Sequence, residues 1–142
     1  MDLKDKKLYI FDLDGTIYLG SRVFPFALTY IRSLREQGKQ VLFFTNNASR
    51  SPEVYLERLT RMGFAPRREE ILTAGDVTIR FLQTMRKGKR VYLVGTRQLE
   101  ESFRAAGIPL ADEAEIVVTS FDTELTYEKL ERAWTLIRNG AE

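Results

Sequence analysis

Leu8-Tyr9-Ile10-Phe11, followed at once by Asp12-Leu13-Asp14-Gly15-Thr16, is the stretch that decides the fold. Four apolar residues end in a polar segment that contains glycine, which is typical of a buried β-strand that stops at a turn. The same pattern returns where Val41-Leu42-Phe43-Phe44 runs into Thr45-Asn46-Asn47-Ala48-Ser49-Arg50. The two stretches therefore predict two strands, each of which ends in a polar loop.

Short apolar runs alternate with longer stretches of helical period along the rest of the chain. Further strands are expected at residues 71–74, 91–94 and 116–118, with helices between them. This alternation is typical of a parallel sheet with flanking helices, so we predict an α/β fold. Four residues are expected to act as helix N-caps, namely Ser51, Asp76, Thr96 and Thr126.

The composition narrows the chemistry that this chain can perform. Its 142 residues include neither cysteine nor histidine. Disulfides, thiolate nucleophiles, histidine bases and metals held by cysteine or histidine are therefore excluded. The remaining groups are carboxylates, hydroxyls, amides, lysine and arginine, and the metal that suits them is an oxygen-binding ion such as Mg²⁺.

The charge balance and hydropathy exclude further classes of partner. The 22 basic and 20 acidic residues give a net charge of +2, which is too small to predict binding to nucleic acid. No apolar run is long enough to span a bilayer, and the polar first residues lack the apolar core of a signal peptide. We therefore expect no nucleic-acid or membrane partner and a cytoplasmic location.

Asp12 and Asp14 are the leading candidates for chemistry. Residues two apart in an extended chain point the same way, with Cα atoms about 6.6 Å apart. Two carboxylates held so close favour a counter-ion, and Mg²⁺ binds carboxylates while it accepts a substrate phosphate. Gly15 allows a sharp turn, which would expose amides to an anion. Asp12 could attack phosphorus, and Asp14 could then protonate the leaving oxygen and activate water.

Thr45 and Asn46 are expected beside this pair, because ligands of open α/β sheets lie beyond the carboxyl ends of the strands. Their hydroxyl and amide can bind phosphate oxygens without adding negative charge. Taken singly, each of the two clusters also fits an ordinary turn. A calcium loop of the EF-hand type is disfavoured, because the glycine comes too early and a strand precedes it. A phosphoacceptor receiver domain is disfavoured too, because Ala74-Gly75 follows the third strand where it needs an aspartate.

Several other conspicuous residues have a simpler structural interpretation. Asp122 is expected in a loop, and residues 86–90 at a solvated helix end. Trp134 is expected in the core, where the last helix would bury Leu130, Ala133, Trp134 and Ile137.

The two polar clusters resemble motifs of the haloacid dehalogenase-like superfamily, and specifically of its p-nitrophenyl-phosphatase-like branch, subfamily IIA. Residues 11–18 match the first motif of that family, and residues 43–51 resemble the second in its extended form. The likeness continues through residues 71–76, 93–96 and 125–127, and so covers nearly the whole chain. It implies a Rossmann-like core followed by an α/β cap.

The resemblance also assigns roles to individual residues. Asp12 would be the nucleophile and a Mg²⁺ ligand, and Asp14 the general acid and base that gives its backbone carbonyl to the metal. Thr45 would bind the transferring phosphoryl group, and Asn46 would orient it. Asn47 and Arg50 would support the loop and the substrate. The reaction implied is hydrolysis of small phosphorylated metabolites through an aspartyl-phosphate.

The resemblance predicts a division of the chain at about residue 75. Residues 1–75 would form the N-terminal part of the core with both motifs, and residues 76–142 the N-terminal part of the cap. Members of that family continue further and carry a lysine and an acidic pair, for which no suitable match is found here. The alternative function is therefore a non-catalytic, truncated or partner-dependent module of the same fold. Such a module is expected to form a homo-oligomer or to pair through its exposed sheet and cap surface.

Overall fold

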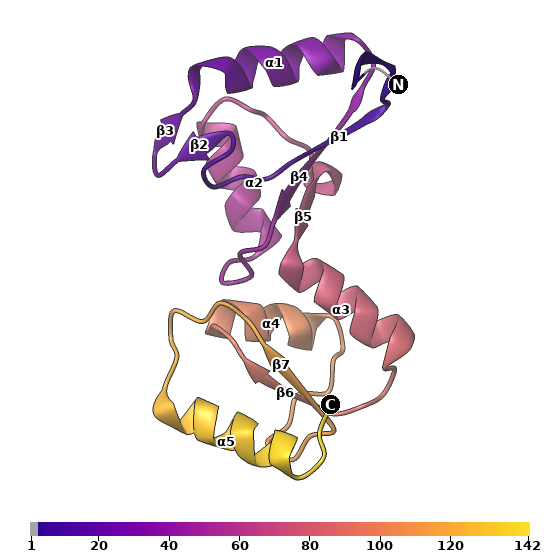
Figure 1. The fold of residues 1–142 in the computed structure, drawn as a ribbon, viewed down its shortest axis with the longest axis vertical. Coiled ribbons are helices and arrows are strands. Elements are labelled where there is room, and N and C mark those ends of the chain that lie inside the picture. Colours follow the sequence, from indigo (N-terminus) through magenta and orange to yellow (C-terminus); the bar gives the residue numbers. More distant parts are fainter. Residues whose placement is uncertain (1–2) are drawn as a thin grey trace. The chain divides into compact units, whose positions relative to one another are not determined.

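The computed structural model describes residues 3–142, which form two compact units (Figure 1). The first unit extends to Asn46 and continues with Pro52–Thr73, and the second combines Asn47–Ser51 with Ala74–Glu142. The chain therefore contributes to the second unit twice, first with five residues and later with its remaining length. The predicted α/β class, with parallel sheets and flanking helices, is confirmed.

The sheet of the first unit contains three parallel strands in the order β1 (Leu8–Phe11), β4 (Gln40–Thr45) and β5 (Ile71–Thr73). Phe11 lies opposite Phe43, and Phe43 lies opposite Ile71. The predicted strands are thus present, but Ala74, which was expected to end the third one, begins a helix instead.

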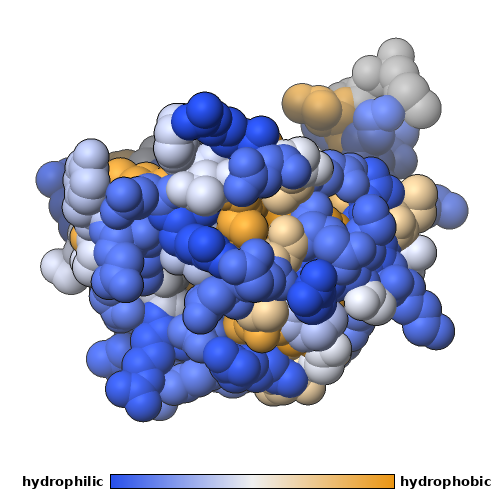
Figure 2. All heavy atoms as spheres, turned by 90° about the horizontal axis from the view of Figure 1, so that it is seen from below, coloured by the Kyte–Doolittle hydropathy of each residue, from blue (hydrophilic) through white to orange (hydrophobic). Residues whose placement is uncertain are grey.

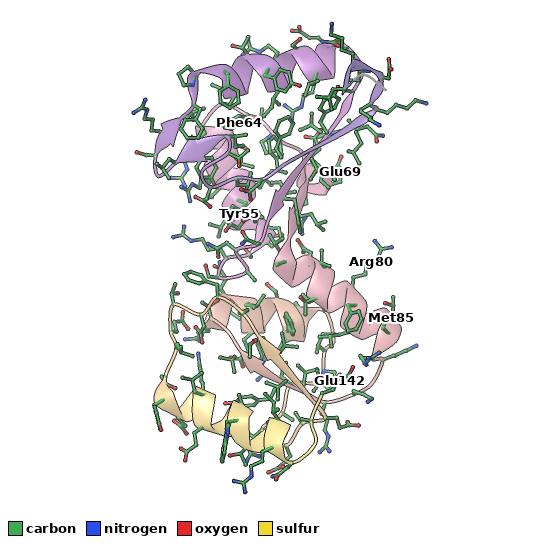
Figure 3. The ribbon with its side chains drawn as sticks, in the orientation of Figure 1. Tyr55, Phe64, Glu69, Arg80, Met85 and Glu142 are labelled. Carbon is green, nitrogen blue, oxygen red and sulfur yellow. The ribbon has the colours of Figure 1, made fainter. Side chains whose placement is uncertain are left out.

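One face of this sheet carries the core of the first unit. The covering helices are α1 (Pro25–Glu36) and α2 (Pro52–Arg61). Tyr55, on α2, and Phe64, which follows this helix, are buried in the core (Figure 3). Four further elements belong to this unit: β2 (Tyr18–Leu19), β3 (Arg22–Val23) and two short 3-10 helices at Leu3–Asp5 and Arg68–Glu70.

The opposite face of the same sheet is apolar and exposed. Leu8, Ile10 and Phe44 have relative exposures of 48%, 59% and 37%. These residues alternate along their strands with the buried or half-buried residues that face α1 and α2, as the two-residue period of a strand requires. We refer to Leu8, Ile10 and Phe44 as the open face.

The second unit is built around the parallel pair β6 (Val91–Val94) and β7 (Ile116–Thr119). Its helices are α3 (Ala74–Met85), α4 (Arg97–Ala105) and α5 (Tyr127–Arg138). Thr96 and Thr126 cap α4 and α5 as predicted, because their hydroxyls accept hydrogen bonds from the Leu99 and Lys129 amides. The Thr96 hydroxyl also donates to the Ser49 carbonyl at 3.0 Å, which ties the 47–51 segment into this unit.

Two predictions for the helices of the second unit were wrong. Asp76 does not cap α3, because the helix already begins at Ala74 and Asp76 lies in its first turn. Trp134 is not in the core but 58% exposed, and Leu130 and Ile137 are about half exposed. The buried residues of α5 are Ala133 and Leu136.

The orientation of α5 follows from two basic side chains on its inner side. Lys129 and Arg132 fall on the same helical stripe as Ala133 and Leu136, and both donate to backbone carbonyls, those of Gly95 and Asp112. The apolar residues on the other stripe are left in solvent. Figure 2 shows apolar residues, in orange, exposed among polar residues on the face of the molecule that it presents.

An ion pair between Lys129, on α5, and Asp122 connects the loop after β7 to Gly95, which follows β6. The Lys129 Nζ donates to Asp122 Oδ2 at 2.8 Å, to the Gly95 carbonyl at 2.9 Å and to the Glu124 carbonyl at 3.2 Å. Asp122 Oδ1 accepts the Glu124 amide at 2.8 Å, and the Asp122 side chain is only 1% exposed. Asp122 is thus a loop residue, as predicted, but one whose carboxylate is buried.

Candidate active site

The structure places Asp12 and Thr45, which begin the two predicted polar clusters, at the same end of the sheet in the first unit. Asp12 directly follows β1, and Thr45 is the last residue of β4. The two strands are adjacent and parallel, with Phe11 opposite Phe43. Asp12 and Thr45 therefore both lie at the carboxyl end of the sheet. Asn46 follows Thr45 and is exposed. This is the position at which open α/β sheets bind ligands.

The turn that follows Asp12 is held by its own hydrogen bonds. The Thr16 hydroxyl donates to Asp12 Oδ2 at 3.1 Å, and the Thr16 amide donates to the Leu13 carbonyl at 3.2 Å. The Gly15 amide, expected to face an anion, donates instead to the Tyr18 carbonyl at 2.7 Å. The conformational role of Gly15 is clear, because its φ of +86° is one that L side chains rarely adopt.

Asp14 is half-exposed, and its carboxylate has two neighbours, a hydroxyl that donates a hydrogen bond and a positively charged guanidinium. The hydroxyl of the fully buried Tyr18 donates to Asp14 Oδ2 at 3.4 Å. A guanidinium nitrogen of Arg58, from α2, lies 4.0 Å from Asp14 Oδ1. Burial, and after it the negative charge of Asp14, raises the pKa of the Tyr18 hydroxyl well above its usual value. The hydroxyl is therefore protonated at neutral pH and acts as a donor.

The residues expected at the second cluster have different environments. The Thr45 side chain is buried at its strand end. Asn47 and Arg50 belong to the 47–51 segment of the second unit, where the Asn47 Oδ1 accepts the Ser49 amide at 2.9 Å and the Ser49 hydroxyl at 2.7 Å. Asn47 thus forms an Asx-type turn, which is a structural role.

The residue types around Asp12 fit a magnesium ion. Mg²⁺ is usually held by one or two carboxylates together with waters and substrate phosphate, and the Asp12 carboxylate and Asp14 carbonyl are oxygen donors of that kind. Within residues 3–142 no three acidic side chains gather into a complete metal cage.

Arg58 and Tyr18 lie beside Asp14, and neither side chain was expected there from the sequence. Tyr18 lies within the first motif, but the pattern of apolar residues does not show where its hydroxyl is directed. Arg58 could have been found from the sequence, because it lies three residues after Tyr55 and one before Leu59, which are both buried residues of α2. A cation on the inner face of a helix is a reason to look for an acidic partner.

A comparison with protein families matches residues 9–109 to haloacid dehalogenase-like hydrolases. An acid sugar phosphatase of Staphylococcus saprophyticus is 35% identical over 141 residues, which are 98% of this chain and 54% of that protein. The 5′-nucleotidase YutF of Bacillus subtilis is 32% identical over 98% of this chain and 55% of its own length.

Solved structures show the same relationship. The crystal structure of a 4-nitrophenylphosphatase from Thermotoga maritima superimposes with a TM-score of 0.89 at 36% identity, over 95% of this chain and 52% of that one. A p-nitrophenyl phosphatase from Archaeoglobus fulgidus gives a TM-score of 0.86 at 33% identity, over 96% of this chain and 53% of that one. The chain spans about half the length of the relatives that it matches.

Proposed function

Because this chain belongs to the haloacid dehalogenase-like hydrolases, we propose that it carries the nucleophile and the general acid of a phosphatase for small phosphorylated metabolites. The observation that supports this most is the placement of Asp12 and Thr45 at the carboxyl ends of adjacent parallel strands. Relatives named as phosphatases support the reaction class.

The proposed reaction has two steps. A carboxylate oxygen of Asp12 attacks phosphorus, the bond to the leaving oxygen breaks, and Asp14 gives that oxygen its proton. Asp14 then takes a proton from water, whose oxygen attacks the phosphorus of the aspartyl-phosphate and releases phosphate and the free Asp12 carboxylate. The Thr45 hydroxyl and the Asn46 amide would bind the phosphoryl oxygens during both steps.

Asp12 and the Asp14 carbonyl would hold Mg²⁺ in this proposal. The ion would offset the negative charge of the phosphoryl oxygens. If so, removal of divalent ions with a chelator abolishes turnover, and added Mg²⁺ restores it.

The substrate is proposed to be a phosphate monoester, as the names of the relatives suggest. We assign the second unit to the N-terminal part of a cap that selects substrates, and we place the protein in the cytoplasm. No helix among residues 3–142 combines the length and apolarity required to cross a bilayer.

The direct experiment is capture of the phosphoryl group. The 142-residue chain is mixed with 4-nitrophenyl phosphate and Mg²⁺, quenched in acid, and digested for mass spectrometry. A phosphoryl group on the peptide that contains Asp12 supports the proposal. Its absence, both from the chain alone and from the complex described below, contradicts it.

The open face supports a second candidate function, a module that acts only with a partner polypeptide. Parallel sheets are normally covered on both faces, whereas Leu8 and Ile10 are about half exposed and β1 is an edge strand. The relatives carry about as much further polypeptide as this chain contains. We therefore propose that an α/β polypeptide corresponding to that further part covers the open face and pairs with β1.

Ile10→Lys is expected to weaken this association at least tenfold, because it places a charge in the apolar contact. The partner is the part of the Staphylococcus saprophyticus phosphatase that this chain does not match, produced separately, and the dissociation constant is measured by analytical ultracentrifugation. Leu3→Lys is the control, since Leu3 is also exposed but lies outside the sheet. A homodimer of the chain that excludes the partner, or a compact monomer that is active alone, would overturn the proposal.

A further inference from the structure

Arg58 makes three contacts with the segment that contains Asp14. Its guanidinium carbon lies 4.5 Å from the centroid of the Tyr18 ring, and its Nη2 donates to the Gly20 carbonyl at 2.7 Å. The same nitrogen lies 4.0 Å from Asp14 Oδ1. Helix α2 is thereby connected to the Asp14 turn and to the hairpin formed by β2 and β3.

Each carboxylate oxygen of Asp14 has its own neighbour. The Tyr18 hydroxyl is directed at Oδ2, and Arg58 lies beside Oδ1. Tyr18 is fully buried, and its backbone is fixed by the hydrogen bond from Gly15. Stacking on this immobile ring fixes the guanidinium of Arg58 in turn. A half-exposed aspartate without such neighbours would exchange among its staggered rotamers.

We propose that Arg58 is a positioning residue that, together with Tyr18, holds the Asp14 carboxylate in one rotamer. The inference rests on the proposed function, because it concerns the residue that exchanges protons with the leaving oxygen and with water. A general acid must lie within hydrogen-bond reach of the atom that it protonates, and a displacement of about 1 Å can cost about 100-fold in rate. Arg58 acts by removing the rotamers in which Asp14 is out of reach.

The test is an NMR measurement of the Asp14 side chain in the 142-residue chain, without substrate or metal. Three-bond couplings from the Asp14 Cγ to its backbone nitrogen and carbonyl carbon report the χ1 rotamer. The unsubstituted chain should show the couplings of a single rotamer. Arg58→Met should show values averaged over several rotamers, because the positive charge and its contact with the Tyr18 ring are both lost. Tyr18→Phe should show a smaller change in the same direction.

Two further variants separate positioning from a general effect on the fold. Arg61→Met makes the same substitution at an exposed position at the end of α2 and should leave the Asp14 couplings unchanged. Arg58→Lys keeps the charge and most of the stem, and should retain more of the single-rotamer character than Arg58→Met. Where phosphatase turnover is measurable, Arg58→Met should lower kcat between about 10-fold and 100-fold and leave KM unchanged.

Asp14 couplings that stay at the unsubstituted values in folded Arg58→Met would overturn the inference. If that variant does not fold, unchanged couplings in Tyr18→Phe, which removes the hydroxyl that donates to Asp14, would overturn it equally. The couplings need no turnover, so their outcome is separate from that of phosphoryl capture on Asp12. An ordered Asp14 together with no captured phosphoryl group, both in the chain alone and in the complex, would contradict the proposed function and leave the inference about Arg58 standing.

Discussion

Asp12→Asn is expected to leave the chain unable to take a phosphoryl group and to lower phosphatase turnover by at least about 1,000-fold. An amide oxygen is a poor nucleophile compared with a carboxylate, so the covalent route is lost while the shape of the side chain is kept. The Thr16 hydroxyl can still donate to the oxygen of the asparagine, as it does to Asp12 Oδ2 at 3.1 Å, so the turn should be preserved. The measurement is mass spectrometry of the acid-quenched chain, which shows whether the peptide that contains residue 12 carries a phosphoryl group.

A comparison of three variants makes this result specific. Asp5→Asn makes the same chemical change at an exposed position outside the site and should label normally. Asp14→Asn should still label with 4-nitrophenyl phosphate, because 4-nitrophenolate leaves readily without a proton. The label should then persist, since hydrolysis lacks its base. Label or normal turnover in Asp12→Asn would show that another residue is the nucleophile.

The second large effect is expected for Lys129→Met, which should lower the free energy of unfolding of the second unit by about 2–3 kcal/mol. The substitution keeps a chain of similar length but leaves the Asp122 carboxylate buried with only the Glu124 amide as a donor. It also removes a donor from the Gly95 carbonyl. Urea unfolding followed by the fluorescence of Trp134, the single tryptophan, reports on this unit.

Two controls accompany this measurement. Lys87→Met changes an exposed lysine of the same unit and should alter stability by less than about 0.5 kcal/mol. Asp122→Asn added to Lys129→Met should recover part of the loss, because it removes the buried unpaired charge. A stability of Lys129→Met equal to that of the lysine control would show that the pair contributes nothing.

The strands and their order of appearance could be predicted because their signals are local. Each apolar run is short and ends in a polar turn, and the cap residues Thr96 and Thr126 use hydroxyls that interact with the next helical turn. Asp12 and Thr45 were predicted to share an edge for the same reason, since parallel strands align their carboxyl ends. The roles proposed for these residues remain predictions.

Features that depend on distant partners could not be predicted in this way. Helix α5 has more apolar residues than one stripe can bury, so periodicity alone cannot tell which stripe is inside. The hydrogen bonds of Lys129 and Arg132 to carbonyls of other segments decide it. The hairpin of β2 and β3 has two residues in each strand, which is too short for a period to be visible.

The five residues Asn47–Ser51 have a practical consequence for dissecting the molecule. Cloning boundaries are normally drawn through one continuous stretch, and here that would suggest a fragment beginning at Ala74. Such a fragment would lack the Ala48 methyl group from its hydrophobic cluster and the Ser49 carbonyl that receives the Thr96 hydroxyl. Expressing the two units separately therefore calls for a rearranged gene, in which a short linker fuses residues 47–51 to the piece that starts at residue 74.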